Sequence, residues 1–192
     1  MVYPASMFDH ASLKDALSAV GDLLEDRGER FEVIAIGGGA LLLLGLIERS
    51  TRDLDLVAMK VGDVLVKPTP LPAALAAAAN DIGELMGLAP GWFNAGPASL
   101  LDLGLPEGFL ARTIRREYAG LVIHLASRLD QICFKVYAAV DDSPRGKHFA
   151  DLKELTPTPD ELRAAAAWVM THDTSSGFRE ILDQVLAALG AT

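Results

Sequence analysis

Apolar and polar residues follow two different periods along the first part of the chain. Near the N-terminus, apolar residues recur every three or four positions, which is typical of an amphipathic helix. Ser12 and Asp15 form the predicted capping box of this helix, and Gly28 is its predicted stop. The apolar runs Phe31–Ile36 and Leu54–Met59 predict two short, buried β-strands instead.

Glycine and proline residues separate the next elements. The glycines at 37–39 predict a turn into a helix that ends at about Arg49. An alanine-rich helix is predicted over 73–86, and residues 89–110 have the composition of a loop. The run Leu121–Leu125 predicts a third strand.

The remainder of the chain shows only helical patterns. We predict a helix capped by Ser127 and Asp130, a second capped by Thr158 and Glu161, and a last one from about Ser176. The class of pattern changes at residue 126 without a flexible linker. We therefore expect an α/β core over residues 1–126 and a helical part over 127–192 that packs against it.

The composition is that of a globular protein whose net negative charge argues against a broad basic surface. Hydrophobic residues make up 51% and charged residues 22% of the 192 positions, and the net charge is −9. Such a charge argues against nucleic-acid binding through a broad basic face, but leaves a locally basic cleft for RNA or a nucleotide. Arg112, Arg115 and Arg116 could form such a patch, and a solvated helix end is the alternative.

The N-terminus and the cysteine content predict a cytoplasmic chain. One cysteine allows no intrachain disulfide and fits a reducing compartment. The N-terminus lacks the apolar core of a signal peptide, and the most apolar run, Ala40–Ile47, is too short to cross a membrane.

The stretch from Gly37 to Asp55 carries the most informative chemistry. Gly38 and Gly39 open a predicted helix, where consecutive N–H groups and the helix dipole favour a phosphate, although many such turns need glycine only for close packing. Asp53 and Asp55 alternate with leucines, so a strand presents both carboxylates on one face, where they repel unless a cation lies between them. The pattern predicts a Mg²⁺ and nucleoside triphosphate (NTP) site, with a solvated strand end as the alternative.

This stretch resembles the signature of the nucleotidyltransferase superfamily, in which a strand and two glycines are followed, about ten to fourteen residues later, by acid-hydrophobic-acid. The sequence Arg49-Ser50-Thr51-Arg52-Asp53-Leu54-Asp55 is similar to the bacterial branch that contains abortive-infection toxins. Weaker motifs extend the resemblance over about residues 33–170; these are Gly91-Trp92-Phe93-Asn94, Lys135, and Arg145, Lys147, His148, Asp151 and Leu152.

The resemblance implies an α+β fold, with a small mixed sheet flanked by helices, and a nucleotide site. In that site Gly38 and Gly39 hold the triphosphate, with Ser50 or Thr51 as further donors. The same resemblance implies that Asp53 and Asp55 are the Mg²⁺ ligands.

Three further positions follow from the resemblance. Lys135 contacts phosphate, with a snorkelling surface lysine as the alternative, and Asp151 is a catalytic or structural acid. Many catalytic members carry a third carboxylate on a later strand, where this chain has His124, a poor Mg²⁺ ligand.

The expected function is therefore Mg²⁺-dependent transfer of a nucleotidyl group from an NTP to a hydroxyl or phosphate of an RNA, a protein or a small molecule. The most specific version is the toxin of a toxin–antitoxin pair, which implies an antitoxin partner. The alternative is a catalytically inactive module that binds a nucleotide or a partner protein, which the histidine at position 124 favours.

Overall fold

The computed structural model describes residues 7–142 and 146–190, and the chain divides into two compact units. The first comprises the residues up to Leu105 together with Leu110–Ala126, and the second comprises Pro106–Phe109 together with the residues from Ser127 on. The predicted fold class is confirmed, because a mixed sheet with flanking helices forms the first unit and helices form the second.

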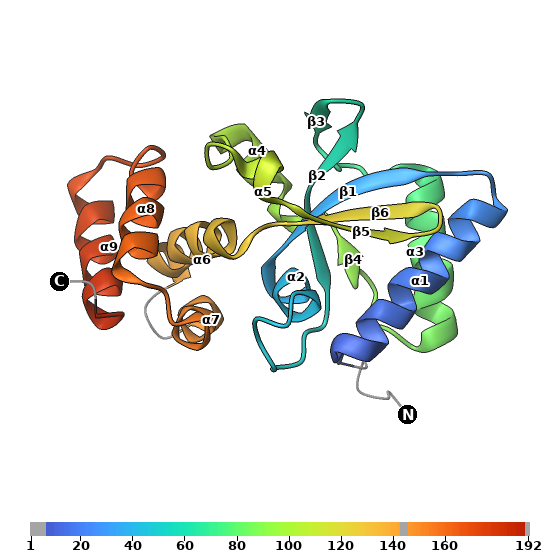
Figure 1. The fold of residues 1–192 in the computed structure, drawn as a ribbon, viewed down its shortest axis with the longest axis horizontal. Coiled ribbons are helices and arrows are strands. Elements are labelled where there is room, and N and C mark those ends of the chain that lie inside the picture. The colour runs from blue at the N-terminus through green and yellow to red at the C-terminus, as the bar shows by residue number, and fades with distance from the viewer. Residues whose placement is uncertain (1–6, 143–145, 191–192) are drawn as a thin grey trace. The chain divides into compact units, whose positions relative to one another are not determined.

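The sheet of the first unit is mixed. Within the described residues, β1 lies at its centre in the order β3-β2-β1-β6-β5 (Figure 1). β4 pairs with the start of β2, and β3 pairs with its end. The β1–β6 and β2–β4 pairs are parallel, and the other pairs are antiparallel. The strands are β1 (Phe31–Ile36), β2 (Leu54–Val61), β3 (Val64–Val66), β4 (Phe93–Asn94), β5 (Ile114–Tyr118) and β6 (Leu121–Leu125).

The three apolar strands were predicted correctly, whereas β3, β4 and β5 were not predicted. β1 and β6 have the expected bounds, and β2 continues two residues beyond Met59. The sequence of β5 is IRREY, whose polar, largely exposed side chains suit an edge strand and give no apolar signal. β3 has only three residues and completes a hairpin with β2.

Two helices of this unit differ from their predicted boundaries. The helices are α1 (His10–Asp26), α2 (Gly37–Leu43) and α3 (Ala73–Met86). The predicted Ser12–Asp15 capping box is wrong, because Asp9 is the N-cap and Ser12 is its N3 partner. α2 includes the three glycines as its first turn and ends at Leu43 rather than near Arg49, because Gly45 has φ +67°, which ends helical geometry.

The predicted loop over 89–110 contains short elements in addition to β4. These are the 3₁₀ helix η1 (Gly96–Ser99), α4 (Leu100–Leu103) and the start of α5 (Phe109–Arg112). Elements of four residues lie below what hydrophobic periodicity can resolve, so the sequence indicated only turns.

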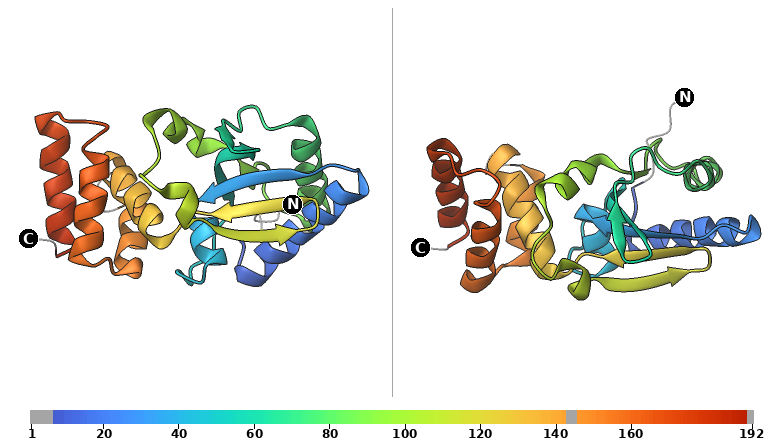
Figure 2. Two further views of the ribbon diagram at one scale, coloured as in Figure 1. Left: turned by 45° about the horizontal axis from the view of Figure 1, so that its top comes forward. Right: turned by 90° about the horizontal axis from the view of Figure 1, so that it is seen from above.

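The two faces of the sheet have different surroundings. α1 packs against β5 and β6, and α3 packs on α1 (Figures 1 and 2). A Cβ on Gly21 of α1 would lie 1.8 Å from the carbonyl oxygen of Tyr118, which shows how closely this helix approaches β5. Because side chains alternate along a strand, Arg115 and Glu117 lie on the opposite face, away from α1.

The second unit is built from four longer helices in its described residues: α6 (Arg128–Asp142), α7 (Lys147–Leu155), α8 (Pro159–Val169) and α9 (Ser176–Ala188). Two predicted caps are confirmed. Ser127 accepts from the amide of Asp130 at 3.3 Å, and Thr158 and Glu161 form a reciprocal capping box. None of the helices in the described part of the chain is long and apolar enough to cross a membrane.

Candidate active site

The first turn of α2 packs directly against the residues that carry the acid pair. Ideal Cβ atoms built on Gly37, Gly38 and Gly39 would lie 2.8 Å from Asp55 Oδ2, 3.1 Å from Thr51 Oγ1 and 2.7 Å from a main-chain oxygen, respectively. Gly37 also has φ +78°, which L-residues rarely adopt. Gly38 and Gly39 are buried. Close packing therefore accounts for this glycine run, and its phosphate role stays a prediction.

The two acidic side chains are half-buried and each has a polar neighbour. Asp55 lies on β2, whereas Asp53 immediately precedes that strand, and Leu54 between them is buried. Asn94 Nδ2 donates to Asp55 Oδ1 at 3.1 Å. The Thr51 hydroxyl lies 3.4 Å from Asp53 Oδ1. The alternation of buried and half-buried side chains agrees with the predicted strand pattern.

The two predicted hydroxyl donors have different surroundings. Ser50 is exposed, and its carbonyl accepts from the Arg49 guanidinium at 3.3 Å. Thr51 is buried, and its amide and carbonyl bond to Phe8 at 3.1 and 2.6 Å. Because the backbone groups of Thr51 bond to Phe8, only its hydroxyl is left as a donor near Asp53.

The acid pair suits Mg²⁺ as an incomplete ligand set. Carboxylate oxygens are hard donors, and Mg²⁺ commonly takes one or two carboxylates and completes its shell with water and substrate phosphates. Within residues 7–142 and 146–190, no group of three or more His, Cys, Asp or Glu side chains is placed to hold a metal. A metal held by Asp53 and Asp55 would therefore need further ligands from a substrate or from water.

His124, at the predicted third-carboxylate position, belongs to another row of the sheet. Asp55 lies opposite Ile36, whereas His124 lies opposite Ile34. The imidazole is also engaged at both nitrogens: Nε2 lies 3.0 Å from Glu32 Oε2, and Nδ1 lies 3.4 Å from Thr113 Oγ1. His124 is thus part of a side-chain hydrogen-bond network with Glu32 and Thr113.

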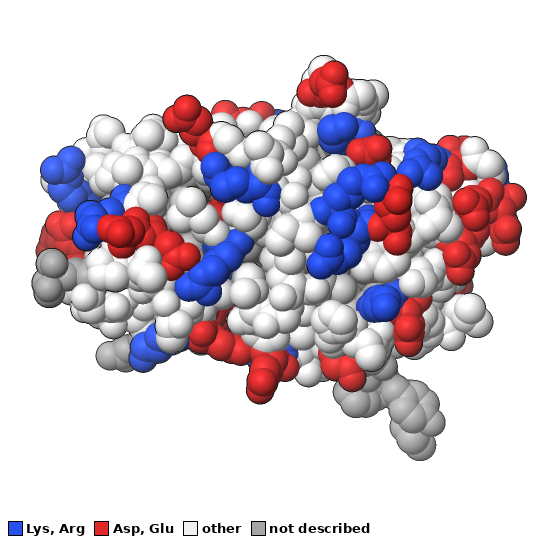
Figure 3. Space-filling view, viewed as in Figure 1, with Lys and Arg blue, Asp and Glu red and all other residues white. Residues whose placement is uncertain are grey.

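Charged side chains around His124 balance one another. The hydrogen bond with His124 lowers the pKa of the Glu32 carboxyl below its ordinary value, and Lys60, 3.7 Å away, adds to this effect although partial burial opposes it. Basic and acidic side chains are interleaved on the face that Figure 3 shows. On the face that Figure 3 shows, the basic side chains therefore do not form one broad basic surface.

The predicted arginine cluster is not one patch. Arg112 ends α5, whereas Arg115 and Arg116 are consecutive residues of β5, so their side chains point to opposite faces. Arg115 forms an ion pair with Glu117. The alternative of a helix end is wrong for these two strand residues.

Lys135 and Asp151 form a buried ion pair inside the helical unit. Lys135 Nζ on α6 lies 2.6 Å from Asp151 Oδ2 on α7, and their side chains are 5% and 0% exposed. A snorkelling surface lysine is therefore the wrong alternative for Lys135. Of the related motif, Lys147, His148 and Leu152 also lie on α7, and Arg145 lies outside the described residues.

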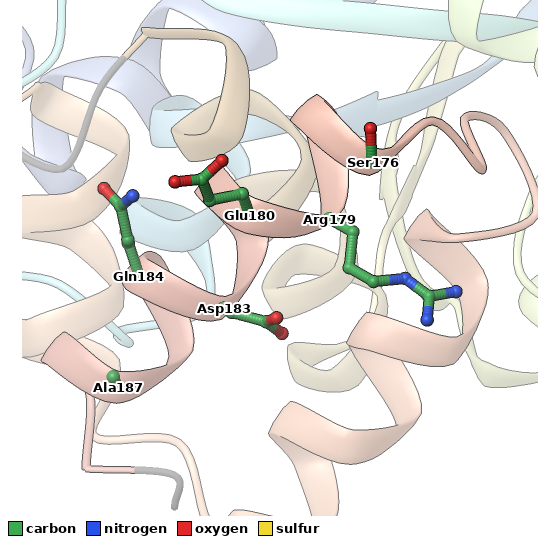
Figure 4. Close-up of a pocket in the computed structure, with 6 residues that line it drawn as sticks. All are labelled: Ser176, Arg179, Glu180, Asp183, Gln184 and Ala187. Atoms are coloured by element: carbon green, nitrogen blue, oxygen red, sulfur yellow. The ribbon is translucent and has the colours of Figure 1, made fainter.

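A hollow on α9 contains none of the predicted site residues (Figure 4). Its lining comes from one helix, so it offers no group of side chains from different elements. The lining residues are Ser176, Arg179, Glu180, Asp183, Gln184 and Ala187.

Comparison with known protein families found a match, which covers most of the first unit and the start of the second. The model of a family described as nucleotidyltransferases of unknown function (DUF6036) matches residues 11–144, well over half of the chain. The chain belongs to this nucleotidyltransferase family. The match includes Asp53, Asp55 and Lys135 and ends before Asp151. Comparison with curated proteins and with solved structures found no match.

Proposed function

We propose that this member of the nucleotidyltransferase family transfers a nucleotidyl group from an NTP to a hydroxyl or phosphate acceptor and requires Mg²⁺. The observation that carries the proposal is the pair Asp53 and Asp55, held against the first turn of α2 in a chain of this family. An RNA, a protein or a small molecule is the acceptor that the sequence resemblance implies.

Each residue of the proposed site has a distinct task. Asp53 and Asp55 would hold Mg²⁺, which when bound would neutralise phosphate charge and lower the pKa of the attacking hydroxyl. Gly38 and Gly39 let α2 approach the acid pair, and in this proposal they also hold the triphosphate, with Ser50 and Thr51 as further donors.

Lys135 and Asp151 have linked tasks in the proposal. The sequence resemblance alone makes Lys135 a contact of a nucleotide phosphate. Asp151 holds the Lys135 ammonium at 2.6 Å, so it would orient that cation rather than react itself. This assignment chooses the structural role for Asp151.

The test compares acceptor labelling by the parent protein with labelling by the double variant Asp53→Asn, Asp55→Asn. The parent protein, with Mg²⁺ and each labelled NTP, is incubated with total RNA, with total protein and with small-molecule extracts. We expect label in one acceptor class with the parent and none with the variant. The matched control is Asp63→Asn, an exposed aspartate in the β2–β3 hairpin, which should label like the parent. Equal labelling by parent and double variant would refute the proposal.

A second function is favoured by the surroundings of His124. Because its ring is engaged by Glu32 and Thr113, it does not supply the metal ligand that catalytic relatives carry on this strand by resemblance. A module that binds a nucleotide or a partner protein without chemistry would share this feature. Calorimetry with ATP, CTP, GTP and UTP in Mg²⁺ separates the two, since tight binding without labelling favours the binding module.

The toxin version of the proposal is supported by the resemblance of residues 49–55 alone. It is tested by induced expression in a bacterial host. We expect growth arrest with the parent chain, normal growth with the double variant, and relief of the arrest by an antitoxin partner encoded next to the gene. Normal growth with a parent chain that labels an acceptor would exclude a toxin and leave the enzyme.

A further inference from the structure

Asn94 is the direct neighbour of Asp55 in the sheet. β4 runs parallel to β2 and places Asn94 in register with Asp55, just as Phe93 lies in register with Leu54. The main chain reinforces this register, because the Leu54 amide donates to the Trp92 carbonyl at 2.6 Å. The position of the Asn94 side chain relative to Asp55 is therefore set by backbone pairing.

The carboxamide of Asn94 connects a donor to an acceptor. Its Oδ1 accepts from the amide of Gly96 at 2.7 Å, and its Nδ2 donates to Asp55 Oδ1 at 3.1 Å. A backbone amide can only donate and an ionised carboxylate can only accept, so the orientation of the carboxamide is determined. An aspartate at position 94 would face Asp55 with a second acceptor and repel it.

The other oxygen of Asp55 also has a defined position. Oδ2 would lie 2.8 Å from a Cβ on Gly37, so it faces the start of α2, while Oδ1 faces Asn94. The hydrogen bond to one oxygen and the closeness of the Gly37 backbone to the other restrict rotation of the carboxylate about its own bond. A free carboxylate would lose this rotational freedom on binding a cation, and a restricted one has already lost it.

We propose that Asn94 is a positioning residue for Asp55, which orients this carboxylate for the divalent cation. This inference rests on the proposed function, because it concerns the same metal site, and it adds a residue to which no role in that site has been given. Neighbours of metal ligands commonly change metal affinity about 10- to 100-fold when they are replaced.

The test measures Mn²⁺ binding to the full chain by electron paramagnetic resonance of the free ion, with and without a non-hydrolysable NTP analogue. The main variant is Asn94→Ser, whose shorter hydroxyl can still accept from the amide two residues on but does not reach Asp55. Asn94→Ala removes both hydrogen bonds, and Asp55→Asn removes the ligand. Asn80→Ser, an exposed asparagine on α3, is the matched control.

We expect the Kd for Mn²⁺ to rise at least about tenfold in Asn94→Ser and in Asn94→Ala, with the thermal unfolding of Asn94→Ser close to that of the parent. Asn80→Ser should bind like the parent, and Asp55→Asn should show the largest loss. Parental affinity in Asn94→Ser would overturn the proposal, even if Asn94→Ala is weakened, because capping of the turn would then be the whole role. Equal binding by parent and Asp55→Asn would overturn the metal site itself, and this inference with it.

Discussion

The buried pair Lys135–Asp151 gives a quantitative test of the helical unit. Replacing Lys135 by Met keeps most of the side-chain volume and removes the ammonium group that forms the ion pair with the Asp151 carboxylate. Because Asp151 is 0% exposed, water does not replace that partner. We therefore expect Lys135→Met to destabilise the second unit strongly.

The magnitude follows from the distance and the burial. Two unit charges 2.6 Å apart attract by about 6 kcal/mol at an effective dielectric constant of about 20. Desolvation of both groups opposes much of this attraction, and removal of one partner from a buried pair costs about 3–5 kcal/mol. A double variant Lys135→Met, Asp151→Leu removes both charges of this pair, and its stability should lie within about 1 kcal/mol of the parent or above it.

The assay is urea unfolding observed in each unit separately. Trp92 lies in the first unit and Trp168 lies on α8 in the second, so incorporation of 5-fluorotryptophan provides one ¹⁹F signal for each. In Lys135→Met the Trp168 signal should change at lower urea than in the parent. The control is Lys147→Met on α7, an exposed lysine, which should cost less than about 0.5 kcal/mol.

Two results would refute this reasoning. A cost below about 1 kcal/mol for Lys135→Met would show that the pair is not buried as described. A double variant as unstable as the single one would show that the loss of stability does not come from the charge that remains on Asp151. The same double variant also tests function, because restored stability without acceptor labelling would separate a phosphate contact by Lys135 from its packing role.

Three further outcomes are expected. Burial lowers the pKa of His172, so the unfolded chain takes up a proton more readily than the folded chain does. The stability of the second unit should therefore fall as pH drops below about 6.5, and urea titrations at several pH values should show a weaker dependence in His172→Phe. Gly39→Ala should lower the free energy of unfolding by about 1–3 kcal/mol in calorimetry, because its Cβ would lie 2.7 Å from a main-chain oxygen. Gly177→Ala on α9, whose Cβ would have nothing within 4 Å, should raise it by about 0.5–1 kcal/mol. The lowered pKa of Glu32 stabilises the fold at neutral pH and this contribution is lost as pH falls below about 4.5, so Glu32→Gln should flatten the acid limb of the stability curve.

Local patterns predicted the elements that have strong apolar signals and defined ends. The runs at β1 and β6, the helix α3 and the capping box at Thr158 all lie where the sequence placed them. Edge strand β5 was not predicted because polar side chains lie on both of its faces, so its sequence shows no alternation of apolar and polar residues. Pattern reasoning detects burial, and this strand is largely exposed.

The sequence by itself determined the acid pair and its association with a glycine run, because these depend on residue type and spacing within nineteen consecutive positions, 37 to 55. Only the tertiary structure decided what surrounds them. Asn94 meets Asp55 through the pairing of β4 with β2, and His124 turns to Glu32 through the pairing of β6 with β1. Contacts between residues about 40 to 90 positions apart depend on strand register, which no local pattern encodes.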